Sequence, residues 1–177
     1  MYTLRIVFLI SLPFLSNEAQ YTRLSYNRPT VQDLRNFLNT TLIWVKWRDY
    51  SKTWAGKYYL CESYQPRKKS EDNYLLNQTY IMSGYWYTYE YPAWLSDDKK
   101  REGPTMKVRE SWSSSETYAM IYWNQTEKCG ILSVAHGLCT MMVWNDRINT
   151  TNYGCEKFFK DACHSYTYVI YTMKCKL

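Results

Sequence analysis

The six cysteines are the residues whose chemistry is clearest in this sequence. Cys61 stands apart, and the other five follow in the C-terminal part of the chain, at Cys129, Cys139, Cys155, Cys163 and Cys175. An even set of cysteines in an oxidising compartment forms disulfides, whereas zinc sites need cysteine and histidine at short, regular spacings. Cys155, Cys163 and His164 have no such spacing. We therefore expect three disulfides, with a pairing that the sequence alone leaves open, and neither a metal site nor another cofactor.

Glu110 is a second residue with possible chemistry. If residues 105–112 form a strand, alternation places Glu110 on the same face as Val108 and Trp112. A carboxylate on an inward aromatic face could pair with the ammonium group of a ligand, assisted by cation–π contacts from Trp or Tyr. The alternative is a carboxylate near the open end of the fold, solvated or paired with a nearby Lys or Arg. Because charged groups are rarely buried without a partner, the alternative is the favoured interpretation.

No catalytic constellation accompanies these residues. The two histidines, His136 and His164, stand beside loops or cysteines, and the chain has no Gly-x-Ser-x-Gly motif, metal-spaced cluster or phosphate-binding loop. We therefore do not expect an enzyme. The formal net charge of +6 is mild for 177 residues, and the basic triplets 67–69 and 99–101 do not continue into a basic helical face. These triplets are typical of solvated loops, so no nucleic-acid partner is expected.

The first residues determine the expected compartment. Residues 1–19 carry Arg5 and then an apolar run over 6–15 that is too short to cross a bilayer and is typical of a secretory signal peptide. A buried N-terminal helix is the less favoured alternative. Residues 20–177 would then form one secreted, extracellular, monomeric domain without membrane insertion. Four glycosylation sequons agree with secretion and favour exposed positions, at Asn39, Asn77, Asn124 and Asn149.

Strand-like segments must position these residues. Aromatic residues make up 18% of the chain, and Gly and Pro are few, a composition that favours strands. Segments with strand character follow one another at 41–48, 58–64, 73–82, 84–91, 105–112, 116–123, 128–134 and 138–144. Helical patterns are confined to 30–38, where Thr30 can cap and Asp33 lies at the third helical position, and to 154–163. The pattern predicts an all-β fold, an eight-stranded antiparallel meander that closes into a barrel.

The interior of such a barrel is the expected binding site. A barrel of eight strands is just wide enough to hold one small ligand. Tyr118 shares a face with Met120 and Tyr122, but in residues 84–91 both faces are aromatic and the orientation stays open. A cavity walled by Tyr, Trp, Met and Ile with one or two polar groups is the general form of a small-molecule site. The alternative is an interior that side chains fill without a ligand.

Several motifs together resemble the tick salivary lipocalins, the group named after its histamine-binding members. Besides the secretory signal, they are residues 45–50 (Val-Lys-Trp-Arg-Asp-Tyr), Trp54 leading to Cys61, residues 128–131 (Lys-Cys-Gly-Ile), 138–143 (Leu-Cys-Thr-Met-Met-Val) and 155–163, with Cys175. The likeness covers essentially the whole mature chain and depends on the order and spacing of the motifs. It implies a lipocalin-like barrel with a short N-terminal helix and a C-terminal helix packed on the barrel. It also implies the disulfides Cys61–Cys175, Cys129–Cys155 and Cys139–Cys163.

The resemblance implies a function as well: capture of a small host mediator or lipid, which suppresses host inflammation or immunity. Ligands in the family are biogenic amines such as histamine and serotonin, leukotrienes and other fatty-acid derivatives, and sterols. The family's amine binders have a tryptophan that Trp54 resembles, but they place acids where this sequence has Gly130 and Thr140. An ammonium inside a barrel needs compensating charge, which Glu110 and Glu62 could supply. We therefore favour an apolar or amphipathic ligand over an amine.

The side chains expected to contact the ligand are those of Trp44, Trp54, Glu110, Trp112 and Tyr118. In a further alternative the barrel is only a scaffold, and the protein binds a host immune protein or cell through the surface loops 66–72 and 96–103. These hypotheses differ in one observable property. A carrier binds a small molecule, whereas a scaffold binds none from a broad panel.

Overall fold

The computed structural model describes residues 27–97, 103–111, 113–164 and 166–175. The expected signal peptide, residues 1–19, lies outside the described residues, as do Trp112 and most of the charged loop 96–103. Within the described part of the chain, no helix has the length and apolar character needed to cross a membrane.

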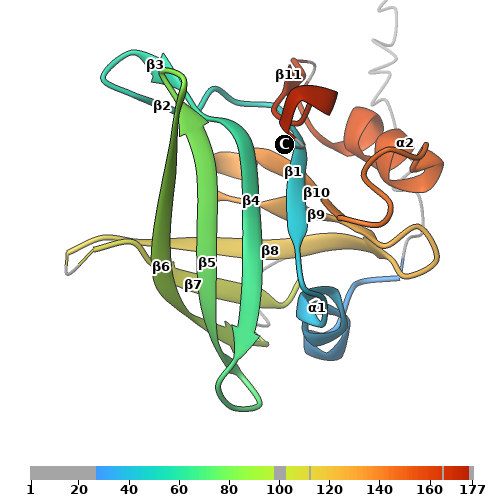
Figure 1. Cartoon of the computed structure of the whole chain (residues 1–177). Coiled ribbons are helices and arrows are strands. Elements are labelled where there is room, and N and C mark those ends of the chain that lie inside the picture. The colour runs from blue at the N-terminus through green and yellow to red at the C-terminus, as the bar shows by residue number, and fades with distance from the viewer. Residues whose placement is uncertain (1–26, 98–102, 112, 165, 176–177) are drawn as a thin grey trace, which may run out of the picture.

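Eight antiparallel strands close into a barrel, which confirms the predicted fold (Figure 1). In sheet order they are β1 (Ile43–Arg48), β4 (Leu60–Lys68), β5 (Asn73–Met82), β6 (Tyr85–Ser96), β7 (Thr105–Arg109), β8 (Ser115–Asn124), β9 (Cys129–Ser133) and β10 (Cys139–Trp144). Pairing of β10 with β1 closes the sheet. A short strand, β11 (Tyr168–Val169), adds to β1, and η1 (Ala135–Gly137) connects β9 to β10.

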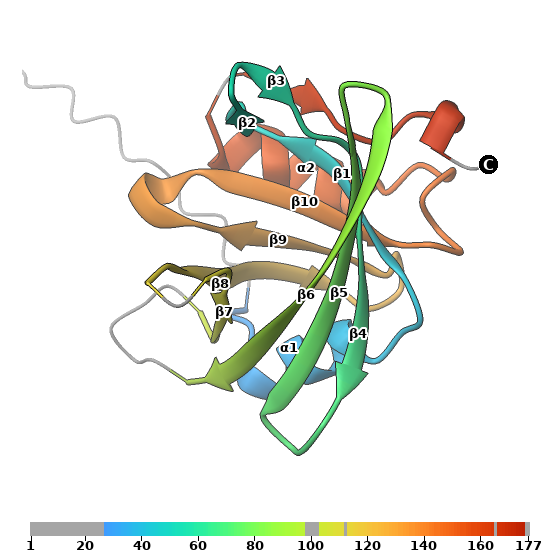
Figure 2. The same ribbon diagram turned by 60° about the vertical axis from the view of Figure 1, so that its left-hand side comes forward.

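A small hairpin that the sequence did not predict precedes β4. It consists of β2 (Thr53–Trp54) and β3 (Lys57–Tyr58), and its turn residues Ala55 and Gly56 both have positive φ, as a two-residue hairpin turn requires. The expected strand 58–64 therefore begins two residues late, at Leu60. The hairpin projects from the same end of the barrel as the β5–β6 turn (Figure 2).

The strand expected over 105–112 is also shorter than predicted, since β7 ends at Arg109. The backbone N–H groups of Glu110 and Ser111 both donate to the carbonyl oxygen of Ser114, which forms a tight turn into β8. Strand alternation stops before Glu110, so its side chain does not point inward among apolar residues. It lies at the barrel mouth, as the favoured interpretation of the sequence stated.

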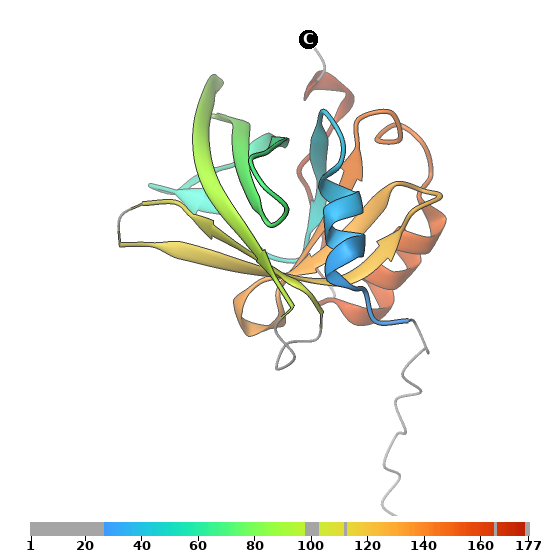
Figure 3. The ribbon, with the colours of Figure 1, turned by 90° about the horizontal axis from the view of Figure 1, so that it is seen from below.

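The helix α1 (Val31–Leu38) closes the opposite end of the barrel. Thr30 and Asp33 form a capping box, in which the backbone N–H of each residue donates to the side chain of the other. Leu34 and Phe37 are fully buried, and Trp144 Nε1 donates a hydrogen bond to the carbonyl oxygen of Phe37. Seen from below, α1 lies between the two sides of the barrel (Figure 3).

Strand alternation sorts the apolar residues into two clusters. Inside the barrel, side chains such as Val45, Leu76, Met120 and Leu132 pack with the buried face of α1. Outside it, residues of β9 and β10 that point the other way, Ile131, Met141 and Val143, pack against Phe158 and Phe159 of α2 (Tyr153–Ala162). The second cluster holds the C-terminal helix on the barrel wall, so the interior stays available to a site.

Three disulfides fasten the C-terminal segment to the barrel. Cys129–Cys155 joins β9 to α2, and Cys139–Cys163 joins β10 to the end of the same helix. Cys61–Cys175 joins β4 to η2 (Met173–Cys175). This is the pairing that the resemblance implies.

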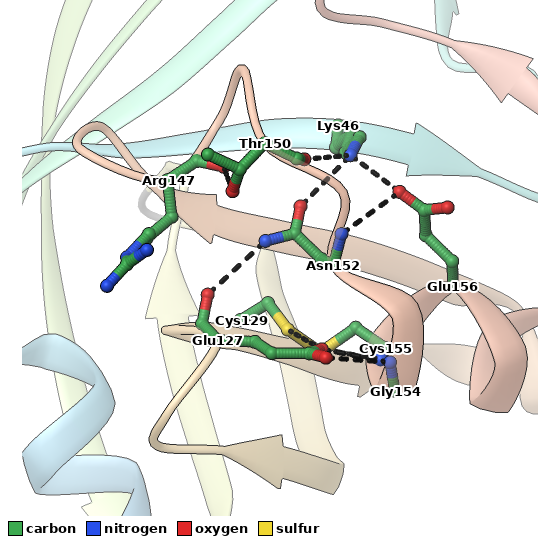
Figure 4. A network of polar contacts seen from close by, with 9 residues as sticks. All are labelled: Lys46, Glu127, Cys129, Arg147, Thr150, Asn152, Gly154, Cys155 and Glu156. Atoms are coloured by element: carbon green, nitrogen blue, oxygen red, sulfur yellow. Dashed lines mark hydrogen bonds and ion pairs between the residues drawn. A yellow bond between two sulfur atoms is a disulfide. The ribbon is translucent and has the colours of Figure 1, made fainter.

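A polar network fixes the start of α2 (Figure 4). The carboxylate of Glu127 accepts hydrogen bonds from the backbone N–H groups of Gly154 and Cys155, and so places negative charge at the helix N-terminus, where it is favourable. From β1, Lys46 Nζ donates to Asn152 Oδ1 at 3.0 Å and to Glu156 Oε1 at 2.8 Å. Each of these charged groups has its partner within the network, so we assign the network a structural role.

Candidate functional site

A small closed cavity lies inside the barrel, above α1. Apolar side chains form most of its wall: Val45, Leu76, Met106, Val108 and Met142. The polar groups on the wall are Arg48, Tyr50, Tyr64, Tyr118 and Thr140. The space open to the centre of a water molecule is only about 20 Å³, which is close to the minimum for one water. The walls are therefore those of a small-molecule site, but side chains fill most of the interior in this conformation.

The charged centre of the interior is an ion pair between Arg48 on β1 and Glu62 on β4. Arg48 Nη2 donates to Glu62 Oε2, and the two side chains are 2% and 0% exposed. The other carboxylate oxygen, Oε1, accepts hydrogen bonds from Tyr64 at 2.6 Å and from Gln78 at 2.8 Å. Both oxygens of Glu62 are thus occupied by protein donors.

Both members of this pair stay ionised. Burial by itself would raise the pKa of Glu62, but the attraction of Arg48 and Lys52, with the hydrogen bond from Tyr64, outweighs burial and lowers the pKa to about 2. Burial would lower the pKa of Arg48, and the attraction of Glu62 reverses this and raises it. The interior therefore contains a fixed carboxylate and a fixed guanidinium at neutral pH.

Arg48 has more hydrogen-bonding capacity than its partner uses. Its Nε and Nη1 atoms are buried and have no hydrogen-bond partner among the residues that the structure describes. A guanidinium presents five donors in a planar fork that matches a carboxylate. Unsatisfied buried donors are rare and unfavourable. Arg48, which lines an apolar cavity, is thus prepared to bind an additional acceptor group.

Tyr50 separates this cavity from a wider hollow at the barrel mouth. Its side chain lines both spaces, and its hydroxyl lies 3.1 Å from Thr140 Oγ1 on β10. The Arg48 guanidinium lies over the Tyr50 ring, 5.5 Å from its centroid. Tyr50, held by one hydrogen bond and one cation–π contact, is therefore one of the side chains between the buried guanidinium and the mouth hollow, together with Lys52.

The mouth hollow has a volume of about 620 Å³ and contains several charged groups. Lys52 Nζ lies 4.0 Å from Glu62 and 3.8 Å from Glu110. Burial would lower the pKa of Lys52, but the attraction of Glu62 outweighs burial and raises it, so this lysine is a cation at neutral pH. Glu116 also lines the hollow and accepts a hydrogen bond from the hydroxyl of Tyr118 at 2.6 Å.

A row of tyrosine rings extends from the mouth along β5 and β6. Register pairs Tyr80 with Tyr87, and stacked contacts connect Tyr80 to Tyr87 and Tyr89, and Tyr89 to Tyr91. Since Tyr80 belongs to the same face of β5 as buried Leu76, the four rings lie on the inner face of the sheet. This settles the orientation that the sequence left open for residues 84–91.

The candidate contact residues do not come together at one place. Tyr118 is buried and lines the cavity, and Glu110 lies at the mouth with its side chain 34% exposed. Trp54 is 67% exposed on the β2–β3 hairpin. Trp44 points away from the interior, into the outer cluster, where its indole N–H donates to Asn145 Oδ1 and its ring contacts Tyr171. Trp112 lies outside the described residues.

The central residues of the cavity, Arg48 and Tyr50, were not among those the sequence singled out. Strict alternation from Val45 would place Arg48 on the outer face, with Trp44. A bulge in the pairing of β1 with β10, between Val45 and Trp47, shifts the register by one residue and turns Arg48 inward. Glu62, which the sequence indicated as a possible partner for an ammonium, faces inward because it shares a face of β4 with buried Tyr64.

Known structures resemble this barrel in fold. A crystal structure of AM182 in complex with serotonin aligns with a TM-score of 0.62 over 80% of this chain and 91% of that one, at 14% sequence identity. Japanin from Rhipicephalus appendiculatus, bound to cholesterol, aligns with a TM-score of 0.57 over 79% of this chain and 98% of that one, at 12% identity. No protein-family model matches the chain, and no curated protein matches its sequence. The chain therefore has a lipocalin-like fold, and membership of the tick salivary group stays a prediction.

Proposed function

We propose that this lipocalin-like barrel is a carrier that captures an amphipathic lipid of the fatty-acid type, with its carboxylate on Arg48 and its chain against the apolar wall. The observation that carries the proposal is the buried Arg48 guanidinium, with Nε and Nη1 unpartnered among the described residues. A carboxylate oxygen would accept one of these N–H groups and add a charge-assisted hydrogen bond in an apolar environment. The leukotrienes named by the resemblance have the same head group.

The charges of the interior support an anionic head group over an ammonium. Both oxygens of the buried Glu62 carboxylate already accept hydrogen bonds from protein donors, whereas Arg48 has N–H groups without a partner among the described residues. At the positions where amine-binding relatives would place acids, Gly130 packs against the Phe37 ring and Thr140 bonds to Tyr50. An ammonium moved into this cavity would meet a guanidinium and find no free carboxylate among the described residues, which is unfavourable.

A lipid needs more room than the present cavity gives, so binding requires rearrangement. Two methionines, Met106 and Met142, line the wall, and methionine side chains adapt their shape readily. Rotation of Tyr50 away from Thr140 would join the cavity to the mouth hollow. The tyrosines of β6 would then line the path that the lipid chain follows.

The test compares a long-chain fatty acid with the alcohol of the same chain by calorimetry. The wild type should bind the acid about 10- to 100-fold more tightly, because a hydrogen bond to a charged group contributes about 1.5–3 kcal/mol. The double variant Arg48→Met/Glu62→Gln removes both charges together, so it should retain the fold and bind both lipids equally. Equal binding of acid and alcohol by the wild type would refute the fatty-acid assignment, and so would tight binding of a sterol alone.

An amine ligand is the second candidate, and one observation favours it. Glu110 and Glu116 both line the mouth hollow, close to the tyrosine row, so an ammonium could bind outside the Tyr50 barrier. Titration with serotonin and histamine separates this site from the interior one. Glu116→Gln should weaken an amine at the mouth and leave fatty-acid binding unchanged.

We further propose that the protein works outside the cell by sequestering a host mediator. The three disulfides support an oxidising compartment. Suppression of inflammation or immunity is what the tick resemblance implies for such a carrier. If a broad lipid and amine panel shows no binding, the alternative of a protein-binding scaffold becomes the better account.

A further inference from the structure

Exposed aromatic residues gather at the end of the barrel opposite α1. We define the aromatic rim as the exposed side chains of three segments at this end: residues 51–60, which contain the β2–β3 hairpin, residues 80–89 around the β5–β6 turn, and residues 166–174 with β11 and η2. Figures 1 and 2 show these segments at the same end of the molecule. Their exposed members include Trp54, Tyr58, Tyr85, Trp86, Tyr168 and Met173.

Direct contacts hold the three segments together. The backbone N–H of Tyr59 donates to the carbonyl oxygen of Lys52, and the Tyr59 ring packs on Tyr80 at 4.3 Å between centroids. Leu60 pairs with Ile81 across β4 and β5. The next residue, Cys61, donates to the carbonyl oxygen of Ile170 and forms the disulfide to Cys175. The three segments are therefore held next to one another, and a disulfide ties the third to β4.

The charge of the rim has one sign. The three segments contain Lys52, Lys57 and Lys174, and none contains Asp or Glu. The nearby acids Glu110 and Glu116 line the mouth hollow, where Glu110 is paired with Lys52. The whole chain contains 16 acidic residues, so these three segments differ from the rest of the chain in carrying positive charge alone.

We infer that the aromatic rim docks on the surface of an anionic phospholipid membrane. Tyr and Trp side chains concentrate at membrane interfaces because their rings combine an apolar body with a polar edge, and lysines next to them are attracted to anionic head groups. Protein interfaces also favour aromatic residues, but they enrich Arg and deplete Lys, and the three segments contain Lys without Arg. Such docking is peripheral, so it agrees with the expected absence of membrane insertion.

Docking would place the mouth of the barrel on the lipid surface, since Lys52 belongs both to the rim segment 51–60 and to the lining of the mouth hollow. A carrier of membrane-derived lipids could then take up its ligand without releasing it to water. This consequence depends on the proposed function, whereas docking itself does not. Vesicle binding and fatty-acid binding in solution are therefore measured separately.

The test is co-sedimentation of the disulfide-bonded protein with vesicles of phosphatidylcholine, with and without phosphatidylserine. We expect binding to the anionic vesicles that weakens with salt, and weak or no binding to the neutral ones. Trp54→Ser/Tyr85→Ser should lower the partition coefficient by at least about tenfold, and Lys57→Ala by about fivefold. The matched control is Tyr153→Ser on α2, which is 71% exposed and outside the rim, and it should bind like the wild type.

Three results would overturn docking: no binding to anionic vesicles, rim variants that bind like the wild type, or an equal loss in Tyr153→Ser. A protein partner would then be the better explanation of the rim. Lys57→Ala should leave fatty-acid binding in solution unchanged. A wild type that prefers the fatty acid but does not bind anionic vesicles would overturn docking alone. A wild type that binds the vesicles but does not prefer the acid would overturn the proposed function alone.

Discussion

Arg48 and Glu62 form an ion pair that the barrel removes almost completely from solvent, with side chains 2% and 0% exposed. Removing one partner leaves an unpaired buried charge, so Glu62→Gln and Arg48→Met should each lower the free energy of unfolding by about 3–5 kcal/mol. The double variant should recover most of this loss, because it leaves no uncompensated charge. Urea denaturation of the four proteins measures the coupling. Additive losses would show that the two groups do not act as a pair.

The same pair predicts a dependence of stability on acid. The pKa of Glu62 is lowered in the folded state, from 4.5 to about 2, so its contribution to stability is complete above the unfolded value. It should be lost as the pH falls from about 5 towards about 2, where the native carboxylate takes up a proton. Denaturation midpoints across this range should fall more steeply for the wild type than for Arg48→Met/Glu62→Gln. Parallel curves would contradict the assignment.

The sequence was sufficient to predict the barrel, but not the way in which its charged residues point. Alternating aromatic and aliphatic residues in segments separated by short loops identify a closed antiparallel sheet, and Thr30 with Asp33 identifies the start of α1. The inward position of Arg48 depends on a β-bulge, which is one extra residue in β1 between Val45 and Trp47. A bulge is fixed by the fit between two strands that are distant in sequence, so local periodicity cannot locate it.

Glu110 differs from Arg48, because alternation would place it inward and the structure does not. Alternation carried through residues 105–112 would have given an inward carboxylate, whereas the turn closed by Ser114 ends the strand first. The rule that charged groups avoid unpaired burial predicted the outcome better than the strand pattern did. For Trp44, in contrast, alternation alone gives the correct orientation. Its neighbours Ile43 and Val45 point inward, so Trp44 points to the outer face, where α2 packs.

The disulfides should differ in their contribution to stability. Cys61–Cys175 closes a loop of 114 residues, and Cys139–Cys163 closes one of 24. In the chain-entropy picture, replacing both cysteines by serine should cost about 4–5 kcal/mol for the first and about 3 kcal/mol for the second. Thermal or chemical denaturation of the two paired variants measures the difference. A larger loss from Cys139→Ser/Cys163→Ser would mean that helix docking, and not loop closure, dominates.

The four sequons should not be used equally. Asn39 and Asn149 are exposed, although Asn149 Oδ1 accepts a hydrogen bond from Tyr171, and half-buried Asn77 lies on the outer face of β5, opposite to the inward Leu76 and Gln78. Asn124 is half-buried beside the start of α2, where its Oδ1 accepts a hydrogen bond from the backbone N–H of Glu127 at 3.0 Å. Glycopeptide mass spectrometry of the secreted protein should find Asn124 unmodified and the other three modified. Asn124→Ala should cost about 1 kcal/mol of stability, whereas Asn39→Ala should be neutral.

Tyr50 should control how fast a ligand reaches Arg48. Its hydroxyl is held by Thr140 at 3.1 Å, and its ring stands between the cavity and the mouth hollow. Tyr50→Phe removes that hydrogen bond but keeps the ring, so association and dissociation of a fatty acid should both become about fivefold faster, with little change in affinity. Thr140→Val is the matched variant on the other side of the bond and should have the same effect. Because both changes break one bond, the double variant should be no faster than either single one, as stopped-flow fluorescence can measure. If the rates multiply, or if only the affinity changes, Tyr50 is part of the wall and does not act as a gate.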